Sequence, residues 1–291
     1  MWVYLVGIPI LICIGVYVGR GMSRRSINFK NKKVLIIGGT SGLGLALAIE
    51  IQKRKGDVTV AARRFDLLKS IKEKHGFSVF VADAVRYETL ECLGDDYDFV
   101  FNCAGICYPG YFEDLDVDVF KKSMEINYFG TVNTLMHFYN NNKRPFGFVM
   151  VSSTLSFYSF PGYSSYSPCK AAINSLFDSL EMEMARSGVF LYVYYVSTIK
   201  SRGYDEENKN KPEFTKDIEG RECSKSCSPE ERAKHLLNSM YYNNRIVSDV
   251  NTRLLKVAGR CDSVLDFLFL PLALVLVPFW KLYVKIKFFY F

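Results

Sequence analysis

The middle of the chain alternates between short, nearly continuous apolar runs and longer stretches in which apolar residues recur with helical period. Seven runs have strand character: KVLIIGG (33–39), DVTVAAR (57–63), FSVFVAD (77–83), YDFVFNCAG (97–105), GFVMVSS (147–153), VFLYVYYVS (189–197) and, more weakly, RIVSDV (245–250). Helical stretches such as LGLALAIEIQKRK (43–55) and CKAAINSLFDSLEMEMARSG (169–188) separate them. Runs that are apolar at nearly every position are typical of parallel strands buried on both faces. The alternation therefore predicts an α/β fold with a doubly wound parallel sheet.

The first 19 residues contain no charged side chain. At about 1.5 Å per residue, a helix of this length reaches roughly 28 Å, the thickness of a bilayer core. The basic residues that follow are Arg20, Arg24, Arg25, Lys30, Lys32 and Lys33. Because positive flanks stay on the cytoplasmic side, residues 1–19 are predicted to be a transmembrane anchor with the main domain in the cytoplasm. A cleaved signal peptide is the alternative, but its positive charge normally precedes the apolar run.

A second apolar stretch, FLFLPLALVLVPFW (267–280), lies near the end of the chain and contains Pro271 and Pro278. Its length of 14 residues, its prolines and the basic residues on both sides favour a re-entrant or interfacial membrane segment over a simple span. A buried helix of the main domain is the alternative. The predicted divisions are a transmembrane anchor (1–19), a basic juxtamembrane linker (20–32), a catalytic domain (33–262) and a membrane-associated C-terminal segment (263–291).

The net charge of +7 is a mild basic excess, and several of the charges lie beside the apolar segments. A membrane surface explains them better than nucleic acid, for which no motif is present. Among the eight cysteines, Cys223 and Cys227 have the spacing nearest to a metal-binding pair. No second pair lies close by, so no metal is predicted and the cysteines are expected to be reduced. Residues 205–230 are polar and are expected to form an irregular, mobile excursion near the site.

The first apolar run leads into GGTSGLG (38–44), whose glycines would let backbone amides and a helix N-terminus approach a pyrophosphate. Such a turn, closing a strand and opening a helix, is typical of a dinucleotide site. The second run ends in Arg63 and Arg64, where a carboxylate would favour NAD. Guanidinium groups suit a ribose 2′-phosphate, so NADPH is the predicted cofactor. A solvated arginine pair at the end of a strand is the alternative.

The segment SSYSPCK (164–170) sets Tyr166 and Lys170 four residues apart. That spacing puts both side chains on one face of a helix. Pro168 fits only the first turn of a helix, which predicts Tyr166 at the helix entrance. Taken alone, the spacing is explained most simply by an ordinary amphipathic helix start.

In their order along residues 33–250, the motifs resemble those of the short-chain dehydrogenases/reductases. The family's TGxxxGxG turn is similar to IGGTSGLG, with Ile37 in place of threonine, and its NNAG is similar to NCAG (102–105), with Cys103 a departure. The family's YxxxK matches Tyr166 and Lys170. Its adenine-contacting aspartate, helix asparagine and catalytic serine match, in this order, Asp83, Asn127 and Ser153. The resemblance implies a Rossmann-type catalytic domain.

This resemblance implies that Asn127, Ser153, Tyr166 and Lys170 are catalytic. Tyr166 would exchange a proton with the substrate oxygen, its pKa lowered by Lys170 and by the cofactor's positive charge. Ser153 would hydrogen-bond the carbonyl oxygen, and Asn127 would hold a water that links Lys170 to solvent. The implied cofactor contacts are Gly38, Thr40, Ser41, Gly42, Leu43, Gly44, Arg63, Arg64, Asp83, Ala84, Asn102, Ala104, Gly105, Tyr166, Lys170, Ile199 and Ser201.

One segment departs from the family. VSTIKS (196–201) replaces the proline and glycine of the family's PGxVxT by Val196 and Ser197, although Ile199 and Ser201 still fit. The departure predicts a less sharply turned backbone beside the cofactor, with the reaction class unchanged.

Three stretches are similar to the 3-ketodihydrosphingosine reductases, particularly the fungal ones: VSSTLSFYSFPGYSSYSPCKAA (151–172), SRGYDEENKNKPEFTKDIEG (201–220) and SCSPEERAKHLLNSM (226–240). This resemblance implies NADPH-dependent reduction of a membrane lipid, 3-oxosphinganine, to sphinganine on the cytoplasmic face of the endoplasmic reticulum. The alternatives are a related membrane ketoreductase acting on a 3-oxoacyl-CoA or a steroid, and a non-catalytic nucleotide-binding scaffold.

Two further features stay open at this stage. The acidic residues Asp205, Glu206 and Glu207 are most simply a solvated loop, and an attraction for the substrate's ammonium is the alternative. The long helical stretches around 112–140 and 166–186 could pair in a homodimer, as they do in relatives.

Overall fold

The computed structural model describes residues 26–223 and 228–291. The predicted anchor at 1–19 lies outside the described residues, as does Cys227 of the candidate cysteine pair. All seven predicted strands are confirmed, and they form one parallel sheet in the order β3-β2-β1-β4-β5-β6-β7. Their bounds are β1 (Lys33–Ile37), β2 (Asp57–Ala62), β3 (Ser78–Val81), β4 (Phe99–Asn102), β5 (Phe146–Ser153), β6 (Val189–Val196) and β7 (Arg245–Val247).

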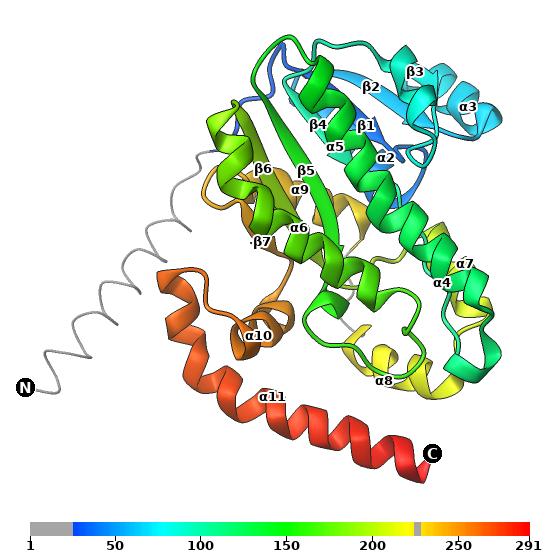
Figure 1. Cartoon of the computed structure of the whole chain (residues 1–291), viewed down its shortest axis with the longest axis vertical. Coiled ribbons are helices and arrows are strands. Elements are labelled where there is room, and N and C mark those ends of the chain that lie inside the picture. Colours follow the sequence, from blue (N-terminus) through cyan, green and yellow to red (C-terminus); the bar gives the residue numbers. More distant parts are fainter. Residues whose placement is uncertain (1–25, 224–227) are drawn as a thin grey trace, which may run out of the picture.

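Helices join the strands and cover both faces of the sheet (Figure 1). One face is covered by α2 (Gly42–Lys53), α3 (Phe65–His75) and α9 (Pro229–Ser239). The other face is covered by α5 (Gly130–Asn141) and α6 (Ser167–Arg186). The remaining helices are α4 (Val117–Met124), α7 (Arg202–Lys209), α8 (Glu213–Cys223), α10 (Val250–Gly259) and α11 (Val264–Tyr290). The three-layer arrangement is the predicted doubly wound, Rossmann-type fold.

Strand β1 shows why the runs are apolar at nearly every position. Val34 and Ile36 point into the core under α2 and α9, whereas Leu35 and Ile37 point into the core under α5 and α6. All four side chains are at most 1% exposed. A central parallel strand has no solvent face, so a polar residue at alternate positions would be buried on one side or the other.

The order of the strands reverses at β1, which pairs with β2 on one side and with β4 on the other. Ile37 and Asn102 are register partners at the carboxyl ends of β1 and β4. In open α/β sheets, ligands bind in the crevice outside these strand ends, where the order reverses. The fold therefore brings together the glycine turn after β1 and the NCAG segment after β4.

The expectation of an irregular excursion at 205–230 is wrong for the described part of that range, which contains helices α7 and α8. Some of its charged residues pair with one another out of contact with water. Lys211, between the two helices, forms ion pairs with Glu207 and Glu219, and its side chain is 0% exposed. The expected location near the site is confirmed, because Glu207 and Glu219 both line the central cavity.

The C-terminal segment is one continuous helix of 27 residues, α11, and extends beyond the 14-residue apolar stretch on both sides. Pro271 and Pro278 lie inside it, and Figure 1 shows the helix bending along its length. An interior proline removes one backbone hydrogen bond and can kink a helix without ending it. Packing supports α11 here, because Ala273 and Val277 are buried against α10.

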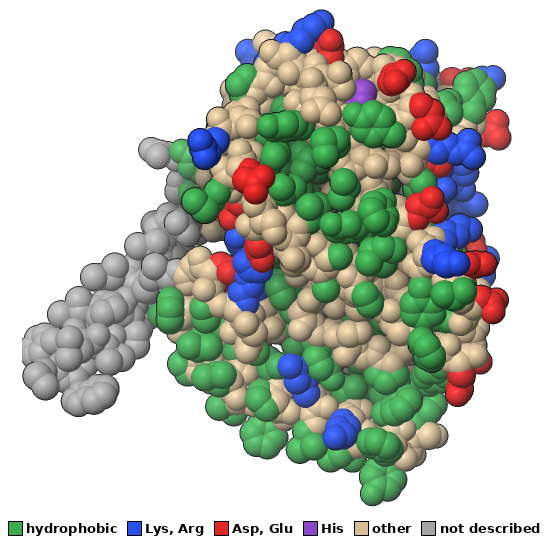
Figure 2. Space-filling view, in the orientation of Figure 1, with side chains coloured by type: hydrophobic (Ala, Val, Ile, Leu, Met, Phe, Trp, Pro, Cys, Tyr) green, Lys and Arg blue, Asp and Glu red, His purple; other side chains and the backbone are tan. Residues whose placement is uncertain are grey.

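By length and hydropathy, Leu265–Tyr290 is long and apolar enough to cross a membrane, and 17% of its most apolar part is buried. Hydrophobic side chains gather along the edge of the molecule formed by α11 (Figure 2). Phe267, Leu274, Val275, Phe279 and Leu282 are each 53% to 68% exposed. So large a contiguous apolar surface is typical of a membrane or partner contact.

Candidate active site

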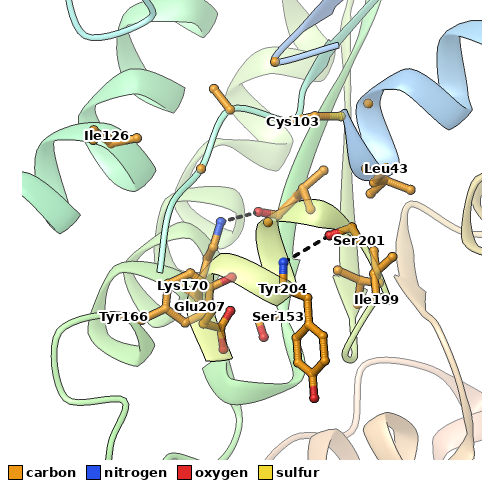
Figure 3. A pocket seen from close by; sticks show the side chains of 18 of the residues that line it. Leu43, Cys103, Ile126, Ser153, Tyr166, Lys170, Ile199, Ser201, Tyr204 and Glu207 are labelled. Carbon is orange, nitrogen blue, oxygen red and sulfur yellow. Dashed lines mark hydrogen bonds between the residues drawn. The ribbon is translucent and has the colours of Figure 1, made fainter. Parts of the chain in front are cut away.

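A cavity of about 410 Å³ opens at the carboxyl ends of the central strands. Every residue predicted for the site lines it except Asn102 and Asn127. Figure 3 shows part of this lining, with Leu43 and Cys103 on one side of the space and Tyr166, Lys170 and Glu207 on another. The structure thus brings together residues that are up to about 160 positions apart in the sequence.

The glycine turn between β1 and α2 forms one wall of the cavity. Gly38 has a φ of +79°, and an added Cβ would lie 2.7 Å from the amide nitrogen of Ala104. At Gly44, an added Cβ would collide with the carbonyl oxygen of Gly38. Helix α2 begins at Gly42, so its unpaired N-terminal amides lie beside this turn. A turn kept open by glycine at a helix N-terminus fits the pyrophosphate of a dinucleotide.

Arg63 and Arg64 follow β2 directly, are exposed and line the same cavity. Asp83 and Ala84 follow β3 and line it from the neighbouring strand. One oxygen of Asp83, Oδ1, accepts a hydrogen bond of 3.1 Å from the amide of Val85. Two positive charges and a carboxylate therefore lie where β2 and β3 end. In the sheet these strands are separated by β1 and β4 from β5, which carries Ser153.

Asn102 is buried behind the cavity wall and holds it in place. Its Nδ2 donates to Thr131 Oγ1 at 2.9 Å, and its Oδ1 accepts from the amide of Ala104 at 3.3 Å. The side chain is 2% exposed. It therefore fixes the turn that carries Ala104 and Gly105 into the cavity wall, although it does not line the cavity itself.

Tyr166, Lys170 and Ser153 meet at the entrance of α6. Tyr166 is the N-cap of that helix and Pro168 lies in its first turn, which confirms the prediction from SSYSPCK. Ser153 ends β5, alongside the helix. Lys170 Nζ donates to the carbonyl oxygen of Val151 at 2.9 Å and lies 5.5 Å from the centre of the Tyr166 ring. One helical turn thus holds the lysine against the tyrosine (Figure 3).

The pKa of Tyr166 differs from the sequence-based expectation. Burial raises it well above its ordinary value, the Glu207 carboxylate raises it further, and a hydrogen bond with Ser153 lowers it. Burial also lowers the pKa of Lys170, to about 8. Removal of the phenol from water therefore outweighs the lowering expected from Lys170. A phenol that keeps its proton is in the form required to donate one to a substrate oxygen.

Asn127 lies in a π-helical turn, Glu125–Phe129, between α4 and α5. Its Oδ1 accepts from the amide of Ile106 at 3.2 Å, and its Nδ2 donates to the carbonyl oxygens of Ile106 at 2.8 Å and Ser123 at 2.9 Å. Wide turns of this kind are frequent at functional sites. The side chain fixes the segment after Gly105, and its role in holding a water stays a prediction.

The segment that departs from the family motif is held by a polar network. Ser197 Oγ donates to Asp249 Oδ2 at 2.6 Å and accepts from Arg232 at 2.5 Å. Arg232 is 4% exposed and also pairs with Asp249 at 3.1 Å. Ile199 and Ser201 line the cavity, and Ser201 caps α7 by accepting from the amide of Tyr204 at 3.3 Å. These contacts immobilise a segment that lacks the family's proline and glycine.

Sequence reasoning missed a group of cavity residues from beyond the main motifs. They are Tyr158, Phe160, Tyr163, Tyr204, Glu219, Leu255 and Trp280. Five of them lie inside the two longest stretches of the subfamily resemblance, 151–172 and 201–220, and that resemblance was the one available signal. Leu255 and Trp280 come from α10 and α11, whose packing against the cavity no local pattern reveals.

The fold and the site together define a dinucleotide-dependent oxidoreductase. The chain belongs to the short chain dehydrogenase family, whose model matches residues 32–212. Members of this family use a nicotinamide dinucleotide as cofactor. Among solved structures, a short chain dehydrogenase from Burkholderia cenocepacia J2315 in complex with NADP has a TM-score of 0.67 and 18% sequence identity. The match covers 80% of this chain and 95% of that one, and it shows a common fold.

Relatives of known name are more similar in sequence. The 3-dehydrosphinganine reductase of Danio rerio is 34% identical over 243 residues, which cover 77% of this chain and 72% of the relative. The 3-ketodihydrosphingosine reductase of Dictyostelium discoideum is 29% identical, over 87% of this chain and 84% of the relative. A PIGF/3-ketodihydrosphingosine reductase fusion protein of Schizosaccharomyces pombe is 33% identical over 89% of this chain, which spans 57% of the fusion protein's length.

Proposed function

We propose that the protein reduces 3-oxosphinganine to sphinganine with NADPH, in the endoplasmic reticulum membrane and on its cytoplasmic face. The observation that carries the proposal is the meeting of Ser153, Tyr166 and Lys170 in one cavity with the glycine turn. The names of the relatives from Danio rerio and Dictyostelium discoideum support the substrate.

The cavity fits the proposed cofactor. The glycine turn at Gly38 and Gly44 leaves space that any side chain would fill, as a pyrophosphate requires. Arg63 and Arg64 supply two guanidinium groups after β2, which is where a ribose 2′-phosphate would need them. The preference for NADPH over NADH therefore rests on these two side chains, and the Asp83 carboxylate would contact the adenine end.

The proposed chemistry divides among three side chains. When bound, NADPH supplies the hydride. Tyr166 donates its proton to the substrate oxygen, for which its raised pKa keeps the proton available. Ser153 hydrogen-bonds the same oxygen and stabilises the charge that develops on it. Lys170, four residues after Tyr166, holds its cation near the phenol and favours the phenolate that forms.

The apolar wall of the cavity suits the chain of a lipid. It is formed by Tyr158 and Phe160 from the segment after β5, Leu255 from α10 and Trp280 from α11. The Tyr158 and Trp280 ring centres are 4.9 Å apart, so α11 closes this side of the cavity directly. The same helix carries the exposed apolar surface, which brings the cavity next to the hydrocarbon phase where the substrate resides.

We infer from this packing that α11 lies in the plane of the membrane interface. Ala273, Val277 and Val284 are at most 5% exposed because they pack on the catalytic domain. A helix that spans the bilayer could not keep those contacts with a domain outside it. Residues 1–19 would then be the spanning anchor, 20–32 its basic linker, and 263–291 a monotopic segment. A homodimer through the helices of 112–140 (α4 and α5) and 166–186 (α6) stays a prediction.

The test uses the full-length chain purified in detergent, with 3-oxosphinganine and NADPH. We expect rapid NADPH oxidation, weak oxidation of NADH, and a loss of about 10²-fold or more in kcat for Tyr166→Phe. Tyr241→Phe, an exposed tyrosine on the surface, is the matched control and should retain activity. No turnover by protein that binds NADPH would contradict the substrate assignment, and a panel of 3-oxoacyl-CoA and steroid ketones would then be tried.

A further inference from the structure

Three charged side chains lie close together next to the end of the cavity that contains Tyr166. Lys211 lies between Glu207 of α7 and Glu219 of α8, with its Nζ 2.8 Å from Glu207 Oε1 and in contact with Glu219 Oε2. The exposed fractions of the three side chains are 0%, 18% and 12%. Two carboxylates face one ammonium, so this cluster of three side chains carries a net negative charge away from bulk water.

The two carboxylates differ in how many of their oxygens already accept strong hydrogen bonds. Both oxygens of Glu219 have partners: Thr198 Oγ1 donates to Oε1 at 2.8 Å, and Tyr163 donates to Oε2 at 2.8 Å. At Glu207, Oε1 lies 2.8 Å from the same Tyr163 hydroxyl and shares its single proton with Glu219, and Lys211 contacts this oxygen as well. The Cys107 thiol also interacts with the Glu207 carboxylate, but a thiol is only a weak hydrogen-bond donor. Oε2 of Glu207 is therefore the oxygen that a stronger donor can take.

Glu207 is also the carboxylate nearest to the chemistry. Figure 3 shows it beside Tyr166 in the cavity, and its charge acts on the Tyr166 phenol. Its neighbours on α7 do not share this environment, because Asp205 and Glu206 are exposed and Glu206 pairs with Lys209 at 2.6 Å. Of these three consecutive acidic residues, only Glu207 lines this cavity, because successive residues of a helix point in different directions.

We propose that Glu207 recognises a cationic amine on the carbon next to the reacting ketone, with Lys211 and Tyr163 as positioning residues that hold its carboxylate. This inference rests on the proposed function, in which the substrate carries an ammonium group beside its carbonyl. A buried carboxylate whose second oxygen has only a weak thiol donor nearby can form a strong, charge-assisted hydrogen bond to such a group. A neutral ketone of the same length would leave Oε2 of Glu207 without a strong donor inside the cavity, which disfavours its binding.

The experiment compares two substrates in the full-length enzyme with NADPH: 3-oxosphinganine and its analogue in which hydrogen replaces the amino group. The readout is the ratio of the two kcat/KM values. We expect the wild type to favour the amine, and Glu207→Gln to lower the ratio by roughly 10- to 100-fold. Glu206→Gln is the matched control, one residue away and exposed, and should keep the wild-type ratio. Glu207→Asp keeps the charge at a shorter reach and should give an intermediate ratio.

The outcomes separate the inference from the proposed function. Turnover of 3-oxosphinganine with an unchanged ratio in Glu207→Gln would overturn the inference alone. Turnover of neither ketone by the wild type would overturn the proposed function and the inference with it. If Glu207→Gln loses its thermal transition, Glu207→Asp takes its place, and a ratio equal to that of the wild type would again overturn the inference.

Discussion

Asp266 attaches α11 to the catalytic domain, and replacing it tests how that helix is held. The side chain is 0% exposed and lies in the first turn of α11. Its Oδ2 accepts from Lys256 Nζ at 2.7 Å and from the amide of Ser263 at 3.1 Å, and its Oδ1 accepts from Arg253 at 3.2 Å. The side chain of Lys256, on α10, is itself only 4% exposed. Asp266→Asn keeps the shape and removes the charge.

The expected cost follows from what the substitution leaves behind. Removing one partner of a buried ion pair costs about 3–5 kcal/mol, because the other charge stays buried without compensation. Here Asp262 remains 3.1 Å from Lys256 and compensates part of the loss. We therefore expect a decrease of about 3 kcal/mol in the free energy of unfolding, which corresponds to roughly 6–12 °C in melting temperature for a domain of this size.

The assay is thermal unfolding in detergent at neutral pH, with NADPH absent. Asp118→Asn is the control, since its ion pair with Lys121 lies on the surface and its side chain is 83% exposed. Such a pair contributes at most about 1 kcal/mol. The reasoning would be refuted by a change for Asp266→Asn no larger than that of the control. The double substitution Lys256→Met with Asp266→Leu should recover much of the loss, because the two most deeply buried charges are then removed together.

Two further predictions concern charges in the cavity. Arg63→Ala combined with Arg64→Ala should raise KM for NADPH by about 10- to 100-fold relative to KM for NADH, and an unchanged ratio would exclude these arginines as the 2′-phosphate site. Burial lowers the pKa of Lys211, but Glu207 and Glu219 more than reverse this and hold it above its ordinary value of 10.5. Its ion pairs should therefore stabilise the fold fully below pH 10.5 and lose their effect as pH rises further. A Lys211→Met variant should accordingly be less stable than the wild type up to that pH and approach it above, as melting temperatures across pH would report.

The sheet and the core of the site could be predicted because their signals are local. An apolar run such as 33–37 has to be a buried strand, and a proline at 168 has to lie in a first helical turn. Once the strands are ordered, their carboxyl ends bring Gly38, Ser153 and Tyr166 to one edge. The positions of these residues follow from topology, without knowledge of any side-chain contact.

The remaining features depend on contacts between distant segments. Residues 205–230 are predicted from the sequence to be irregular because they are polar and show no apolar period, and the ion pairs that bury Lys211 join residues from two separate helices. Pro271 and Pro278 favoured a re-entrant or interfacial segment, and the sequence did not reveal that packing on α10 supports one continuous helix through both prolines. The raised pKa of Tyr166 likewise depends on burial inside the assembled cavity, which no spacing in the sequence encodes.

Trp280 belongs both to the wall of the cavity and to the helix that carries the exposed apolar surface. With α11 at the membrane interface, as proposed, the enzyme would encounter its substrate by lateral diffusion, in two dimensions. Its rate should then depend on the mole fraction of substrate in the membrane or micelle and hardly on the bulk concentration. Adding inert detergent at constant total substrate should slow the reaction through surface dilution alone, so a Michaelis constant for this protein has meaning only when it is expressed per unit of lipid surface.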